Sequence, residues 1–176
     1  MPGADAGSRL SADASRNSPR PPKSLKARAI ALHARREYSR AELRERLVAG
    51  AGRSDPEPTA LDAVLDELAA LGYLSDERFA KSVVRQKTGG YSKRAIGATL
   101  KARGVGSDAA TDALAGVDID DQETLVALWC RRFGKPPAND REKSRQVRFL
   151  QSRGFSLSAI LKLLRSPPGD GGAENP

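Results

Sequence analysis

The positive charge of this chain is concentrated near its C-terminal end, where basic residues recur at a spacing that suits the binding of phosphates. The sequence has 176 residues, with 30 Lys and Arg against 22 Asp and Glu, and a net charge of +8. Residues 124–165 hold ten of the basic and two of the acidic side chains, and the rest of the chain is neutral overall. Arg141, Arg145 and Arg148 follow i, i+4 and i+7, which places them on one helix face. A guanidinium fork binds two oxygens of a phosphate or carboxylate, so this stripe predicts an anionic partner.

Further basic residues extend this candidate surface. Arg131, Arg132 and Lys135 close the helix before the stripe, and smaller basic stripes occur in the middle of the chain. A solvated helix face, with C-terminal Arg residues that complement the helix dipole, remains the alternative for each of them. The candidate contacts with nucleic acid or protein are Lys81, Arg85, Arg94, Lys101, Arg131, Arg132, Lys135, Arg141, Lys143, Arg145, Arg148 and Arg153.

The sequence offers no catalytic group, cofactor site or metal site. One His and one Cys cannot form a His/Cys metal cluster, and no glycine-rich loop ends in Lys-Ser/Thr to hold a nucleotide. We predict that Trp129 lies in the core, that Cys130 is inert packing within a helix, and that His33 is on the surface. A single Cys and the absence of an apolar run of ~18 residues favour a soluble, cytoplasmic protein without a membrane segment.

The elements that carry these residues are expected to be helices throughout. Leu61, Leu65 and Leu68 belong to an apolar stripe of helical period, and no convincing strand pattern is present. Ser39 and Glu42 have the spacing of a capping box, and Ser75, Ser92, Ser107, Asp120 and Ser156 stand where they could begin other helices. The predicted helices cover residues 25–36, 40–49, 58–71, 76–88, 92–103, 107–114, 121–133, 140–152 and 156–165.

The nine predicted helices repeat as three sets of three. Tyr38-Ser39 matches Tyr91-Ser92 at an offset of 53, and Arg103-Gly104 matches Arg153-Gly154 at an offset of 50. Each Gly of these pairs fits the position after a helix, where φ is positive. We therefore predict an all-α chain of three tandem three-helix repeats that form an elongated, curved body, with a compact bundle as the alternative. The predicted parts are a disordered tail (1–23), repeats 24–75, 76–120 and 121–165, and a second disordered tail (166–176).

Three motifs of the chain, in this order, resemble the RecX family of regulatory proteins. They are Arg36-x2-Ser39-x2-Glu42-Leu43-x3-Leu47, then Gly72-Tyr73-Leu74-Ser75-Asp76-Glu77-Arg78-Phe79-Ala80, and finally Arg153-Gly154-Phe155. The resemblance covers about residues 26–165. Ser75 stands where the family usually has Asn, and Val105 where Ile is more common.

The resemblance implies three tandem three-helix repeats and a non-enzymatic modulator, usually an inhibitor, of the RecA recombinase filament on single-stranded DNA. The expected partners are that filament and single-stranded DNA, with non-specific duplex binding possible, and the expected state is a monomer. A helix-turn-helix transcription regulator is the alternative, although the third helix of each repeat is acidic or aliphatic and so is poorly suited to base reading. A general helical-repeat adaptor would favour a shorter period of ~34 or ~40–47 residues.

Overall fold

The protein is helical wherever its structure is described. The computed structural model describes residues 24–50 and 56–168, and these form nine α-helices and no strand. The helices are α1 (Leu25–His33), α2 (Arg40–Ala49), α3 (Pro58–Ala70), α4 (Asp76–Lys87), α5 (Lys93–Ala102), α6 (Ser107–Ala115), α7 (Asp121–Arg132), α8 (Asp140–Ser152) and α9 (Leu157–Arg165). The predicted all-α class is confirmed.

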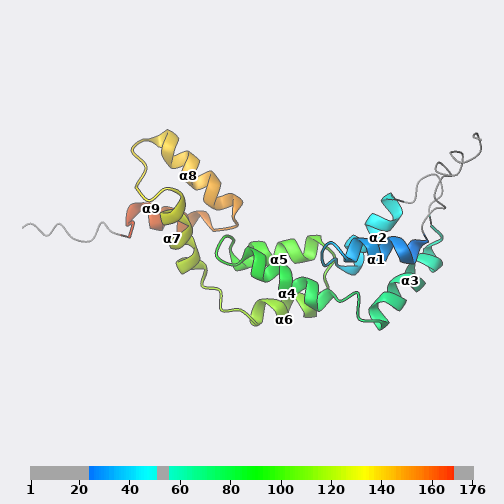
Figure 1. Cartoon of the computed structure of the whole chain (residues 1–176). Helices are drawn as coiled ribbons and strands as arrows, with labels where there is room; N and C mark the ends of the chain where they lie inside the picture. Colours follow the sequence, from blue (N-terminus) through cyan, green and yellow to red (C-terminus); the bar gives the residue numbers. More distant parts are fainter. Residues whose placement is uncertain (1–23, 51–55, 169–176) are drawn as a thin grey trace, which may run out of the picture.

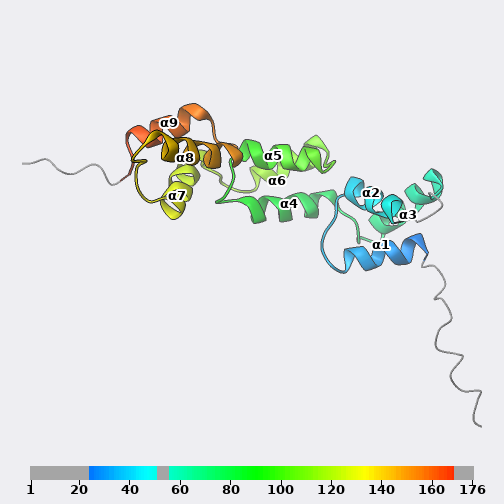
Figure 2. The ribbon, with the colours of Figure 1, turned by 90° about the horizontal axis from the view of Figure 1, so that it is seen from above.

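The helices gather into three groups of three (Figures 1 and 2), and each group has its own hydrophobic core. We call the groups the first (α1–α3), second (α4–α6) and third (α7–α9) modules. Leu43 and Leu65 lie in the core of the first, Phe79 and Ile96 in that of the second, and Trp129 in that of the third. The modules follow one another along a shallow arc with the first and third at opposite ends (Figure 1), so the elongated repeat is confirmed over the compact bundle.

Local capping explains most of the helix starts. The hydroxyls of Ser39 and Ser92 accept the N–H of the third residue beyond them, as does that of Ser156. Two details of the prediction are wrong. Ser107 is the first residue of α6, and Gly106 is its N-cap without a side-chain bond. Glu42 does not complete a capping box, because its carboxylate instead faces the guanidiniums of neighbouring Arg residues.

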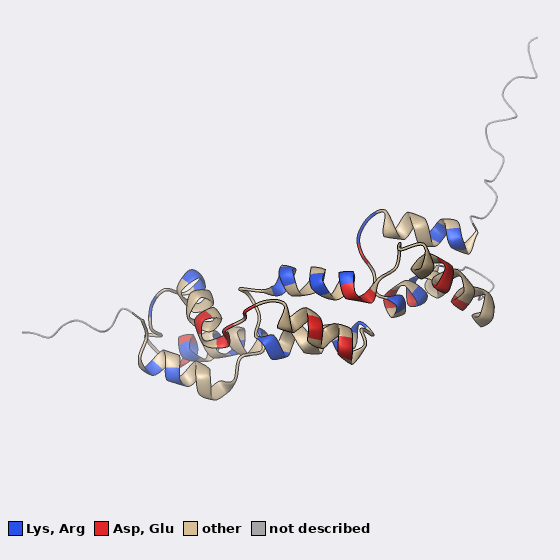
Figure 3. Ribbon diagram, turned by 90° about the horizontal axis from the view of Figure 1, so that it is seen from below, with Lys and Arg blue, Asp and Glu red and all other residues tan. Residues whose placement is uncertain are grey.

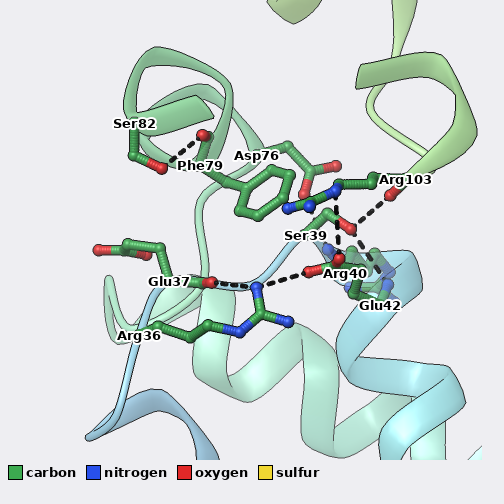
Figure 4. Close-up of polar contacts among 9 residues, drawn as sticks. All are labelled: Arg36, Glu37, Ser39, Arg40, Glu42, Asp76, Phe79, Ser82 and Arg103. Atoms are coloured by element: carbon green, nitrogen blue, oxygen red, sulfur yellow. Dashed lines mark hydrogen bonds and ion pairs between the residues drawn. The ribbon is translucent and has the colours of Figure 1, made fainter. Parts of the chain in front are cut away.

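The first and second modules are joined where α2 begins (Figure 4). Ser39 is fully buried, and its hydroxyl donates to the carbonyl oxygen of Arg103 at the end of α5. The N–H of Arg40 donates to Oδ1 of Asp76, the first residue of α4, at 2.8 Å. These two bonds tie the start of one module's second helix to two separate points on the next module.

The second and third modules are joined by a similar set of hydrogen bonds, made by Ser92 and Asp121. The hydroxyl of Ser92 donates to the carbonyl oxygen of Gly154 at 2.9 Å, and its N–H donates to that of Arg153 at 3.0 Å. The N–H of Lys93 donates to Oδ1 of Asp121 at 2.7 Å. The repeat seen in the sequence is therefore a repeat of the contact between modules as well as of the helices.

Two glycines allow the modules to approach this closely. Gly104 and Gly154 have φ of +72° and +93°, as predicted for the residue after a helix. A Cβ on Gly104 would lie 2.3 Å from Cβ of Ala41, and one on Gly154 would lie 2.4 Å from Cβ of Ala95. Each position therefore excludes a side chain both by its backbone conformation and by the neighbouring module.

Three of the individual predictions outside the repeat have mixed outcomes. Trp129 is buried as expected, but Cys130 is exposed and does not contribute to packing. His33 is half-buried, with its ring 5.8 Å from that of Tyr38, because the first module packs around it. Burial lowers the pKa of His33 below its usual 6.5, which favours the neutral ring.

The predicted tails lie almost wholly beyond the part of the chain that the structure describes. Residues 1–23 and 169–176 are outside it, whereas Pro167 is described and buried. Within the described residues no helix is long and apolar enough to cross a membrane.

A series of glycine substitutions separates the effect of positive φ from that of the close contact between modules. Gly89 also has positive φ (+75°), but a Cβ there would have no neighbour within 4 Å, and at Gly90 the nearest atom would be 3.7 Å away. We expect Gly90→Ala to change the free energy of unfolding by less than about 0.5 kcal/mol and Gly89→Ala to cost about 1–2 kcal/mol. Gly154→Ala should cost a further 1–3 kcal/mol or so from overpacking. Urea unfolding followed by circular dichroism measures all three, and equal losses at positions 89 and 154 would disprove the steric role of Gly154.

Candidate nucleic-acid interface

A buried side-chain network fixes the start of the basic surface in the third module. Trp129 of α7 donates its indole N–H to Oε1 of Gln146 on α8 at 2.8 Å, and both side chains are buried. The amide nitrogen of Gln146 donates to the carbonyl oxygen of Lys135 at 3.3 Å. The loop between α7 and α8 is thereby held against both helices, and with it the cations that flank it.

Three of the predicted cations meet beside this network. Arg132, Lys135 and Arg145 line a surface hollow of about 200 Å³, together with Gln146 and Glu142. The carboxylate of Glu142 accepts the N–H of Ala138 at 2.9 Å, so it serves as a brace for the loop. Cations from α7, the loop and α8 thus converge although they are up to thirteen residues apart in sequence.

The predicted stripe on α8 points into solvent. Arg141, Arg145 and Arg148 are all exposed, while Gln146 and Leu150 form the buried face of the helix. Lys143 is also exposed but lies off this stripe, about half a turn round the helix from it. We refer to Arg141, Arg145 and Arg148 as the α8 stripe.

A second hollow lies on the third module beside its junction with the second, because two of its lining residues, Arg131 and Arg153, contact Gly89 and Tyr91 of the second module. It has a volume of about 500 Å³ and is lined by Leu128, Arg131, Arg132, Phe149 and Arg153. Arg132 also lines the first hollow, so the two hollows are neighbours on the surface. We call this second site the junction hollow. Its aromatic member was not among the predicted site residues, because helical spacing alone assigned Phe149 no role.

The predicted cations of the second module do not form one group. Lys81 and Arg85 line a hollow of about 380 Å³ with Arg78, but Glu37 and Asp112 line it too. Arg94 is engaged, since its guanidinium donates to the carbonyl oxygen of Gly154 at 3.1 Å. Lys101 is exposed on α5 and joins neither group.

The ion pairs of the described residues separate the modules further. Every pair found there joins residues between positions 26 and 103, including Arg40 with Asp66 and Arg103 with Glu42. Within residues 56–168, no carboxylate pairs with a cation of the third module. Figure 3 shows Lys and Arg on the helices of this module and along α4. No group of side chains that could hold a metal ion is found in the described chain.

Comparisons with known proteins agree with this architecture. The family domains described as "RecX, second three-helix domain" and "RecX, third three-helix domain" match residues 75–114 and 119–164. The regulatory protein RecX of Leptothrix cholodnii is 44% identical over 83% of this chain and 90% of its own length. That of Chromobacterium violaceum is 42% identical over 84% of this chain and 93% of its own length. The crystal structure of RecX from Lactobacillus salivarius shares the fold, with a TM-score of 0.59, 20% identity, and coverage of 80% of this chain and 94% of that one.

The network at Gln146 predicts a measurable loss on substitution. Gln146→Leu leaves the Trp129 indole N–H and the Lys135 carbonyl without partners, which should cost about 1–3 kcal/mol of unfolding free energy. Trp129 is the only Trp of the chain, so its fluorescence during urea unfolding reports the third module directly. Gln151→Leu, at an exposed position on the same helix, is the matched control and should unfold like the parent. Identical unfolding curves for the two variants would show that the network does not hold the loop.

Proposed function

This chain belongs to the RecX family of regulatory proteins, and from that membership we propose that it regulates the RecA recombinase by binding the filament that the recombinase forms on single-stranded DNA. In this proposal the chain limits ATP hydrolysis, strand exchange or filament extension without catalysing a reaction itself. The elongated arc of three modules suits a long, repetitive partner better than a compact target.

One observation carries the proposal beyond the family name. Residues 124–165, which make up most of the third module, hold the entire charge excess of the chain, and none of their cations is paired with a carboxylate in the described structure. Unpaired, exposed guanidiniums on one face repel one another by a few tenths of a kcal/mol per neighbouring pair. A polyanion removes that repulsion and gains the entropy of the counterions it releases.

The arrangement of the third helices argues against sequence-specific DNA reading. In a helix-turn-helix protein the recognition helix needs exposed polar groups that can reach base edges. Here α3 presents Asp62 and Asp66, which face Arg40 and Arg44 of α2. The third helix of the last module, α9, exposes Leu157. The observations therefore favour contact with the DNA backbone or a protein surface.

The central test is the ATPase activity of RecA on single-stranded DNA, measured with and without this protein. We expect the rate of ATP hydrolysis to fall as the protein is added, under conditions where the recombinase alone is fully active. An unchanged rate, at concentrations where the protein remains folded and soluble, would overturn the proposed function.

Charge reversal on the α8 stripe tests which surface is used. If Arg145 and Arg148 each contact a phosphate, R145E/R148E should lower the salt slope of binding to single-stranded DNA by about 1.4. The corresponding loss of affinity is about 25-fold or more at 0.1 M salt, and inhibition should weaken with it. Folding should be retained, because both side chains are exposed.

The matched control is R35E/R46E, which makes the same change in net charge at two exposed, unpaired positions of the first module. Arg40 and Arg44 are unsuitable because each faces an Asp of α3. If both double variants lose affinity equally, net charge rather than the α8 stripe determines binding.

A further inference from the structure

The internal repeat provides its own comparison for one arginine. Arg103 and Arg153 occupy equivalent positions, each at the end of a module's second helix and directly before a glycine of positive φ. Both are partly buried at a junction between modules. Their electrostatic surroundings differ, although at each junction a serine of the preceding module donates a hydrogen bond to the carbonyl oxygen of the arginine.

At the first junction the arginine is paired with a carboxylate of the neighbouring module. Nε of Arg103 lies 3.6 Å from Oε1 of Glu42, whose other oxygen is 3.1 Å from a guanidinium nitrogen of Arg36 (Figure 4). The Arg103 guanidinium also lies 5.8 Å from the centre of the Phe79 ring. Glu42 therefore offsets part of the charge of Arg103, and the pair links the two modules.

At the second junction no carboxylate takes that place. The repeat offset of 53 puts Ala95 at the position of Glu42, and no acidic side chain pairs with Arg153 within the described chain. Its guanidinium lies instead between two rings, 4.6 Å from the centre of Tyr91 and 5.1 Å from that of Phe149. The rings hold the group in position, yet they leave most of its charge and its donors free for an anion.

Other cations lie around the same two rings. The Arg132 guanidinium is 5.7 Å from the centre of Phe149, and the Lys87 ammonium is 4.0 Å from that of Tyr91. Arg131 reaches across the junction to the carbonyl oxygen of Gly89 at 3.3 Å. The junction hollow is lined by three arginines and by no acidic residue. Such a site is complementary to negative charge only.

We propose that the junction hollow binds the phosphodiester backbone of single-stranded DNA, with Arg153 and Arg132 as the contacting groups. The hollow is open to the surface and shares Arg132 with the neighbouring hollow, which Lys135 and Arg145 also line. Basic groups therefore continue from the junction to the α8 stripe, and such a track suits a chain of phosphates better than one small anion. This inference rests on the proposed function, because it names where the strand of the filament is held.

The test compares equivalent arginines in direct DNA binding. The probe is a fluorescein-labelled oligothymidine, titrated with the full chain across a salt series and without recombinase. We expect Arg153→Ala and Arg132→Ala each to reduce the affinity about fivefold at 0.1 M salt and to lower the salt slope by about 0.7. Arg103→Ala should bind like the parent although it loses its ion pair, and Arg153→Lys should retain the salt slope of the parent because it keeps the charge.

Several results would overturn the inference. One is a parent chain that does not bind the oligonucleotide, and another is Arg132→Ala and Arg153→Ala variants that bind like the parent at every salt concentration. A third is competition by ATP or by polyglutamate. If either displaces the oligonucleotide from the parent and from Arg103→Ala but not from Arg153→Ala, the hollow binds a nucleotide or an acidic protein instead. Arg132 is exposed, so its variant stays informative even if Arg153→Ala unfolds.

The outcome is separable from that of the proposed function. Loss of DNA binding in Arg153→Ala, with no effect of the parent on RecA, would support the hollow and overturn the proposed function. Inhibition of RecA by a parent chain that does not bind the oligonucleotide would support the proposed function and overturn the assignment of the hollow.

Discussion

The architecture depends on the close contact between the start of one module's second helix and the end of the next module's second helix. At both junctions a buried serine hydroxyl accepts an N–H from its own helix and donates its proton to a carbonyl of the neighbouring module. A hydroxyl can do both because it has one donor and two acceptor sites. The contact requires that the residue facing it have no Cβ, and Gly104 and Gly154 meet this requirement. The order of the modules and the arc they form follow from this repeated contact.

Most of the fold was predictable because its signals are local. Helical periodicity and N-cap residues gave the nine helices to within a few residues, and the Arg-Gly pairs gave the two positive φ angles. Contacts between distant residues were not predictable. Neither the hydrogen bond from the backbone N–H of Arg40 to Asp76 nor the network of Gln146 leaves a sequence signal, because both depend on how separate helices pack. The exposure of Cys130 and the partial burial of His33 were missed for the same reason.

The candidate site divides in a similar way. A charge count located the excess in residues 124–165, since net charge needs no structure. It could not show which arginines are already paired, because pairing depends on the neighbouring helix. Arg40 faces Asp66 of α3, whereas the α8 stripe faces solvent. The aromatic rings that hold Arg153 come from two modules, and only the junction brings Tyr91 and Phe149 together around it.

The two junctions show how a repeat can keep its shape while its parts acquire different roles. The hydrogen bonds that fix the geometry come largely from the backbone and from serine and aspartate, so they do not depend on the charge of the arginine beside them. Glu42 pairs with that arginine at the first junction, and alanine stands in its place at the second. Burial of an unpaired cation away from water costs free energy. At a surface hollow this cost is low, because water still reaches the group. The second junction can therefore carry an unneutralised guanidinium without loss of the fold, and an anion that binds there gains the attraction that Glu42 supplies at the first.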